Sequence, residues 1–146
     1  MWQINEVLKF DGQLYRILSI NFGDIFWIQI DNKNALPEVV REESLYEYLD
    51  NERLTRAKDP FANLILEEPT VNSIAFAKRD KAFNIIRKII LEPSHYEPSF
   101  RATLIHQIES SGVVSKPTIY KYLRKYWQRG QIPNALLPDY KNSGAP

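Results

Sequence analysis

Residues 112–129 read GVVSKPTIYKYLRKYWQR, and this stretch carries the clearest indication of the fold. Gly112 is typical of a helix end, Ser115 is a favoured N-cap, and Pro117 falls in the first helical turn, where proline is tolerated. Gly130 marks the next stop. The stretch therefore predicts a helix that begins after Ser115, ends near residue 129 and follows a tight turn.

Two more helical patterns precede that turn. Ser73 predicts the N-cap of a helix that runs to about residue 91, with an apolar stripe at helical spacing. A second helix is expected from about residue 99 to 111, because apolar side chains again recur every three or four positions. The two stripes consist of Phe76, Phe83, Ile86 and Ile90, and of Phe100, Leu104, Ile105 and Ile108. Three helices with a short glycine-containing turn between the last two are typical of a helix-turn-helix domain, which we expect to fold by itself.

The third helix has an apolar face and a basic face. Ile119, Leu123 and Tyr126 share the apolar face and are expected to pack on the preceding helices. A recognition helix directs its N-terminal side chains at base edges and its flanks at phosphates. Base contacts are expected from Lys116, Thr118 and Lys121, and phosphate contacts from Arg124, Lys125 and Arg129. The full set of candidate DNA-binding residues is Ser115, Lys116, Pro117, Thr118, Tyr120, Lys121, Arg124, Lys125, Gln128, Arg129 and Lys141.

The formal net charge of +1 conceals a division of charge along the chain. Residues 1–75 hold 7 basic and 13 acidic side chains, a net charge of −6, whereas residues 76–146 hold 12 basic and 5 acidic ones, a net charge of +7. This asymmetry favours contact between the basic half and a polyanion such as DNA. The alternative is a basic helix that is merely solvated, with its aromatic side chains in the core.

The first seventy residues indicate strands rather than helices. Asp11-Gly12 and Gly23-Asp24 are turn signals between three runs of extended pattern within residues 7–30, which predict an antiparallel meander. Pro37 is expected to open a helix that ends at Leu49. Residues 53–56 are expected to return as a short strand that closes a small barrel-like sheet.

The expected fold class is therefore α+β. Residues 1–68 form a small antiparallel β unit with a helix, residues 69–131 form the three-helix helix-turn-helix domain, and residues 132–146 form an extended linker to downstream domains. The linker prediction rests on three prolines and the lack of a helical period after residue 131.

Composition argues against several chemistries. The chain has no cysteine, so disulfides, thiolate metal sites and thiol nucleophiles are excluded. His95 and His106 suit no zinc spacing, and the five glycines are scattered, so neither a metal nor a cofactor is expected. No apolar run approaches the ~20 residues of a membrane span, and the first residues lack a secretory pattern. We expect a cytoplasmic protein without a membrane partner.

The motif from Gly112 to Leu123 resembles the turn and recognition helix of the DNA-binding domains of resolvases, invertases and transposases. The run YWQRGQIPNALLPDYKNSGAP over residues 126–146 is more specific. Together with residues 1–7 and the segment around Tyr48-Leu49-Asp50, it resembles the N-terminal region of TnsB-type transposases. These are the DDE-family subunits of heteromeric cut-and-paste transposons, including CRISPR-associated ones.

This resemblance implies sequence-specific binding of double-stranded DNA at transposon ends, which positions a downstream strand-transfer domain. It implies that the chain is a fragment without the catalytic carboxylates, and hence no enzyme by itself. The implied partners of the full-length protein are an endonuclease subunit and an ATPase regulator. The alternative is a protein–protein module, in which the acidic half docks onto other transposition proteins and the basic helices serve as structure.

Overall fold

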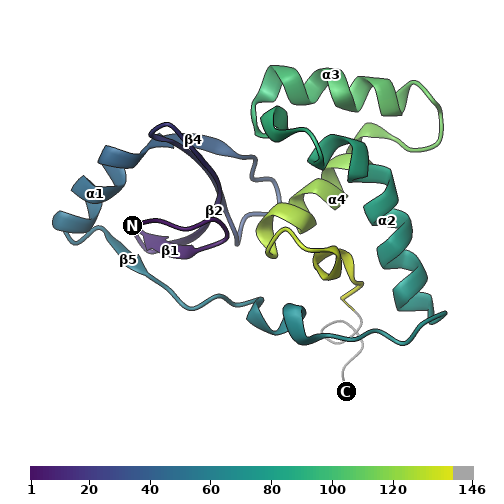
Figure 1. The fold of residues 1–146 in the computed structure, drawn as a ribbon, viewed down its shortest axis with the longest axis horizontal. Coiled ribbons are helices and arrows are strands. Elements are labelled where there is room, and N and C mark those ends of the chain that lie inside the picture. Colours follow the sequence, from purple (N-terminus) through teal and green to yellow (C-terminus); the bar gives the residue numbers. More distant parts are fainter. Residues whose placement is uncertain (140–146) are drawn as a thin grey trace.

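The computed structural model describes residues 1–139 and has the predicted α+β architecture. A five-stranded β unit with helix α1 lies on the left in Figure 1, and helices α2, α3 and α4 gather on the right. Helix α4, residues Lys116–Gln128, lies between the sheet and helix α2, residues Ile74–Ile90. The helix that carries most of the candidate site residues is thus also the one that joins the two parts of the molecule.

The β unit is an antiparallel sheet in the order β4-β3-β2-β1-β5. Its strands are β1 Val7–Phe10, β2 Gln13–Asn21, β3 Asp24–Gln29, β4 Glu38–Arg41 and β5 Leu54–Arg56. The predicted meander and its closing strand are confirmed, since β5 pairs with β1. Positive φ angles at Asp11 and Gly12, 48° and 85°, make the first turn a tight hairpin, because a two-residue loop of this type needs both residues in the left-handed region.

The predicted helix from Pro37 to Leu49 is wrong in its first turn. Residues 38–41 form strand β4, and helix α1 spans only Glu42–Asp50. Val39 and Val40 are β-branched and lie opposite Phe26 and Ile25 of β3. Pairing with β3 covers an edge that would otherwise be open, and this tertiary gain outweighs the helical signal of the proline.

The three predicted helices are confirmed as α2, α3 (Pro98–Glu109) and α4. Ser73 caps α2 as expected, since its Oγ accepts a hydrogen bond from the Phe76 backbone N–H at 3.1 Å. Three short 3₁₀ segments complete the chain: η1 Ala62–Leu66, η2 Pro93–Tyr96 and η3 Pro133–Leu136.

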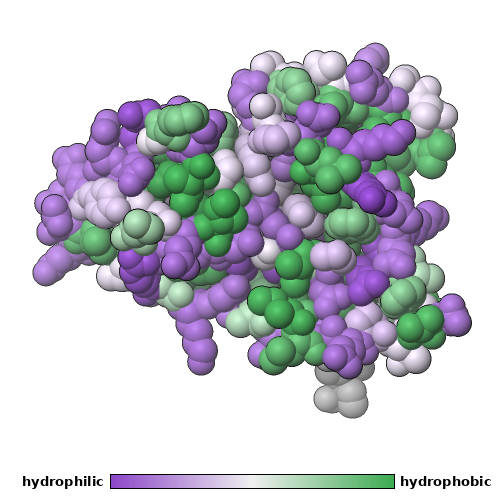
Figure 2. Space-filling model, viewed as in Figure 1, coloured by the Kyte–Doolittle hydropathy of each residue, from purple (hydrophilic) through white to green (hydrophobic). Residues whose placement is uncertain are grey.

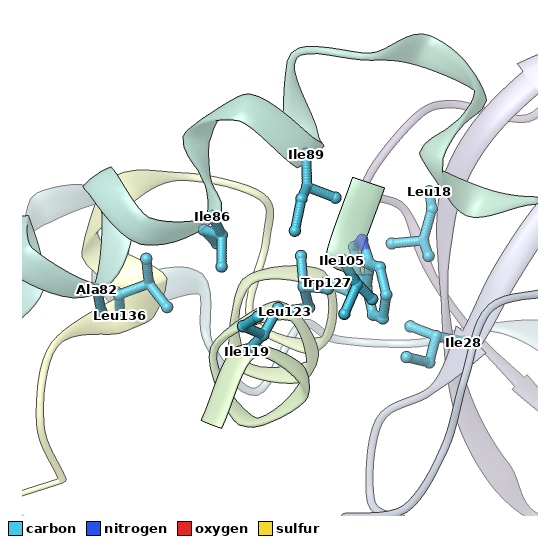
Figure 3. Close-up of a cluster of buried hydrophobic side chains, with 10 residues drawn as sticks. All are labelled: Leu18, Ile28, Ala82, Ile86, Ile89, Ile105, Ile119, Leu123, Trp127 and Leu136. Carbon is cyan, nitrogen blue, oxygen red and sulfur yellow. The ribbon is translucent and has the colours of Figure 1, made fainter. Parts of the chain in front are cut away.

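The core of the helical part extends into the sheet (Figure 3). Trp127 of α4 is fully buried and lies beside Leu18 and Ile28, which come from β2 and β3. The other buried members of this cluster are Ala82, Ile86, Ile89, Ile105, Ile119, Leu123 and Leu136. One cluster thus includes side chains from both parts, and the independent folding of residues 69–131 stays a prediction.

The segment after residue 131 begins differently from the extended linker that we predicted. Residues 133–136 form η3, and Ala135 and Leu136 are buried among the helices. Asn134 Nδ2 donates to the backbone carbonyls of Leu64 and Glu67, both at 2.8 Å. Burial of two apolar side chains and these hydrogen bonds hold the segment against α2 and η1. Lys141 and the rest of 140–146 lie outside the described residues, and the domain limits at 68 and 131 stay a prediction.

Candidate nucleic-acid interface

The N-terminal half of α4 presents an exposed and basic surface. Ser115, Lys116, Pro117 and Lys121 are exposed, and Thr118 is partly buried. Gly112, with φ of +79°, makes the turn from α3 possible, because this left-handed conformation disfavours residues with a Cβ. The opposite face, formed by Ile119, Leu123 and Trp127, is fully buried and fixes the orientation of the helix.

Ser115 stands at the N-cap position of α4, but its hydroxyl does not cap the helix. Its Oγ donates to Thr118 Oγ1 at 3.1 Å instead of accepting from a backbone N–H. The Lys116 backbone N–H donates to Glu109 Oε2 at 3.2 Å. One amide at the start of the helix is thus already paired with a carboxylate, which leaves the Ser115 and Thr118 hydroxyls and the Lys116 side chain as the polar groups of this turn.

The C-terminal half of α4 is bound to the rest of the chain. Arg124 Nε donates to the Ala35 carbonyl at 3.0 Å, and its guanidinium lies 5.3 Å from the centre of the Tyr120 ring. Gln128 Nε2 donates to the carbonyls of Gln29 at 3.0 Å and Asn32 at 2.7 Å. Both side chains therefore connect α4 to the segment that follows β3.

The two remaining basic candidates contact the C-terminal segment. Lys125 Nζ donates to the Leu137 carbonyl at 3.1 Å, and burial lowers the pKa of this lysine. Arg129 donates to both carboxylate oxygens of Asp139, at 2.6 and 3.2 Å, and these bonds lower the pKa of Asp139. The predicted set is thus divided between an exposed start of the helix and an end engaged within the molecule.

A buried arginine, Arg16, fixes the end of α4 against the β unit. Its guanidinium donates to both oxygens of Asp59, at 2.8 and 2.7 Å, and to the carbonyls of Asn5 at 2.9 Å and Gln128 at 3.2 Å. The last carbonyl belongs to the C-terminal turn of α4, where a cation is favoured by the helix dipole. The sequence indicated that Arg16 is buried, because it lies two residues from Leu18 and therefore on the same face of the strand. The sequence did not indicate which groups Arg16 would contact.

His95 is a second buried polar residue that sequence reasoning missed. Trp127 Nε1 donates to His95 Nε2 at 3.0 Å, so the other ring nitrogen, Nδ1, carries the proton and donates to the Glu92 carbonyl at 2.8 Å. Burial and the nearby charge of Arg101 lower the pKa of His95 to about 4, although the bond to Glu92 opposes them. His95 is therefore a neutral structural residue of the core.

Residues 1–139 offer neither a metal-binding cluster nor a membrane-spanning helix. No group of three histidine or acidic side chains is placed to hold a metal ion in this part of the chain. Over the same residues, every helix is too short or too polar to cross a bilayer.

Together these features define a helix-turn-helix unit with an exposed basic helix start, carried on a small five-stranded β unit. The profile of the TnsB N-terminal SH3-like domain matches residues 1–60, and that of the TnsB second domain matches residues 79–140. The chain therefore belongs to the TnsB family of transposition proteins, which confirms the resemblance.

A curated relative supports the same assignment. Over all 146 residues, the chain is 49% identical to the transposon Tn7 transposition protein TnsB of Escherichia coli. The match covers 100% of this chain and 21% of that protein. The chain thus spans about a fifth of the length of that relative. Any activity of the whole protein is therefore a proposal.

Proposed function

We propose that this chain binds double-stranded DNA at transposon ends and that α4 enters the major groove with its N-terminal half. The observation that carries the proposal is the exposed basic start of α4, opposite a face that is rigidly packed. Membership of the TnsB family supports a role in transposition. In the whole protein, this binding would position a strand-transfer domain that lies elsewhere, and the chain itself would not be catalytic.

The candidate residues then divide by role. Lys121 lies on the exposed face one turn into the helix, which suits a base edge, with Lys116 and Thr118 beside it. Ser115 and Pro117 line the entry of the helix. Arg124, Lys125, Gln128 and Arg129 act chiefly by holding α4 in place, since each already has a partner within the chain. Tyr120 supports Arg124 from the side.

Binding titrations with Lys121→Ala test the proposal. The variant is expected to lose roughly 1–3 kcal/mol of binding free energy on a transposon-end duplex and much less on scrambled DNA, because a base contact is specific to sequence. The matched control is Lys9→Ala, which replaces an exposed lysine of β1. This variant should bind both duplexes as tightly as the parent protein does. Equal, small losses on both duplexes would show that α4 is not in the groove.

One observation favours a second candidate function, docking onto another transposition protein such as an endonuclease subunit or an ATPase regulator. Helix α1 exposes three acidic side chains, Glu43, Glu47 and Asp50, together with Tyr46 and Leu49. An acidic surface with a few apolar side chains suits a basic protein partner. On the face drawn in Figure 2, however, apolar side chains lie in separate small groups, whereas docking surfaces more often carry one continuous patch.

A further inference from the structure

The segment between β3 and β4 belongs to the acidic β unit but is fixed on α4. We call residues 30–37 the β3–β4 loop. The Gln128 side chain donates to the carbonyl of Asn32 in this loop and to that of Gln29 just before it. Arg124 Nε donates to the carbonyl of Ala35. Two hydrogen bonds therefore hold the loop against one side of the helix, and a third holds the end of β3 just before it; the three span 89 to 99 residues of sequence.

The attachment lies on the strip of α4 that begins with Lys121. Lys121, Arg124 and Gln128 are spaced by three and four residues, so they follow one another along the same side of the helix. At about 1.5 Å per residue, Arg124 lies about 5 Å further along the axis than Lys121. The loop thus continues the surface with which, by the proposed function, α4 faces DNA.

The dimensions of DNA determine what this loop meets. A helix with its side chains is about 10–12 Å across, and the major groove is about 12 Å wide, so a helix in the groove has a phosphate strand on each side. A loop fixed to the side of that helix lies against one of these strands. The loop carries one exposed lysine, Lys33, in a turn in which Asn32 Oδ1 accepts from the Asn34 backbone N–H at 2.9 Å.

We infer that the β3–β4 loop is a second DNA-binding element and that Lys33 contacts a backbone phosphate beside the groove. This inference rests on the proposed function of α4. The inference also assigns a role to Arg124 and Gln128, because these side chains hold the loop close enough to contact the duplex. The excess of acidic side chains in the rest of the β unit disfavours further phosphate contacts, and Lys33 is the one basic side chain of the loop.

A phosphate contact is non-specific, and this property separates Lys33 from Lys121. Lys33→Ala is expected to weaken binding to transposon-end and scrambled duplexes alike and to reduce the slope of log affinity against log salt by about one unit, since one fewer counterion is released. Lys33→Glu should weaken binding further. Lys9 is the control, because β1 is separated from β3 by β2. Lys9→Ala and Lys9→Glu should leave the slope unchanged.

Placement can be measured directly because the chain has no cysteine. Lys33→Cys, labelled with an iron chelate that cleaves nearby DNA, should cut the transposon-end duplex at a few backbone positions beside one groove. Lys9→Cys should give no localised cuts. An unchanged salt slope in Lys33→Ala together with the absence of localised cuts would overturn the inference. If Lys121→Ala still lost affinity on the cognate duplex in that case, the proposed function would stand and the loop contact alone would be wrong.

Discussion

At the scale of single residues, the buried polar side chains form hydrogen bonds within the chain. Arg101 lies buried on α3, and its Nη1 donates to the carbonyls of His95 and Tyr96. His95 in turn receives the Trp127 indole N–H. A tryptophan at the centre of a core needs an acceptor for its N–H, and a neutral histidine supplies one. These side chains hold η2, α3 and α4 together, and they are buried and not available for contacts at the protein surface.

The neutral state of His95 makes the stability of the chain depend on pH. Its pKa of about 4 in the folded protein lies below the ordinary value of 6.5, so the unfolded state binds more protons between these values. The contribution of His95 to stability should therefore be constant above about pH 7 and fall as the pH is lowered, by on the order of 2 kcal/mol at pH 5. Urea unfolding at pH 7 and pH 5 measures this loss.

His95→Gln supplies the control for this prediction. A glutamine side chain retains an oxygen that can accept from Trp127, but it has no group that titrates in this range. The variant should lose little stability between pH 7 and pH 5, although it starts from a lower value. An equally large acid loss in His95→Gln would assign the pH dependence to other groups.

At the scale of secondary-structure elements, α4 serves two purposes with two faces. Its buried face, with Leu123 and Ile119 fully enclosed, supports the whole helical part. Its exposed face carries Lys116 and Lys121 at the N-terminal half, where we propose the DNA contacts. A helix held on one face by a packed core keeps its other face in a fixed orientation, which sequence-specific contacts require.

Substitutions on the two faces should separate stability from binding. Leu123→Ala is expected to reduce the free energy of unfolding by about 2–5 kcal/mol, because it leaves a cavity in the core. Lys121→Ala should change that free energy by less than about 0.5 kcal/mol, since the side chain is exposed. Denaturant unfolding of both variants compares them. A large loss in Lys121→Ala would mean that its effect on DNA binding reflects folding.

At the scale of the whole molecule, the β unit and the helices form one structure through Trp127 and Arg16. Arg16 of β2 contacts α4 and also Asp59, its charged partner, which lies between β5 and η1. Burial tends to raise the pKa of Asp59, but the hydrogen bonds from Arg16 lower it overall. The relative orientation of the two parts, and with it the position of the β3–β4 loop, depends on this pair.

Asp59→Asn should therefore destabilise the joined structure. The substitution leaves the Arg16 charge buried without a counter-charge, although the new side chain can still accept from the Phe61 backbone N–H. We expect a loss of about 2–3 kcal/mol, less than for a fully buried pair because Asp59 is 30% exposed. Thermal unfolding followed by circular dichroism measures it.

A second arginine–aspartate pair provides the comparison for Asp59. Arg53 and Asp11 are each about half exposed, with a side-chain exposure of 48%, and Arg53 also donates to both carboxylate oxygens of its partner, through Nε and Nη2. Asp11→Asn should cost clearly less stability than Asp59→Asn, because water screens exposed ion pairs. Similar losses in the two variants would contradict a special role for Arg16 in joining the parts.

The sequence by itself determined the local elements and the family. The turn glycines, the N-cap at Ser73, the proline at residue 117 and the apolar periods specified three helices, three strands and the closing strand. These signals succeed because each one depends on residues a few positions apart, whose spacing follows directly from helix and strand geometry.

Only the tertiary structure decided which partners these elements meet. It turned residues 38–41 into a strand, folded residues 133–136 onto the helices, buried Trp127 against the sheet and engaged Arg124, Lys125, Gln128 and Arg129 within the chain. The tie between Arg16 and Gln128 joins residues 112 positions apart. A contact between residues so far apart depends on how whole elements pack. The periodicity of one segment contains no information about that packing.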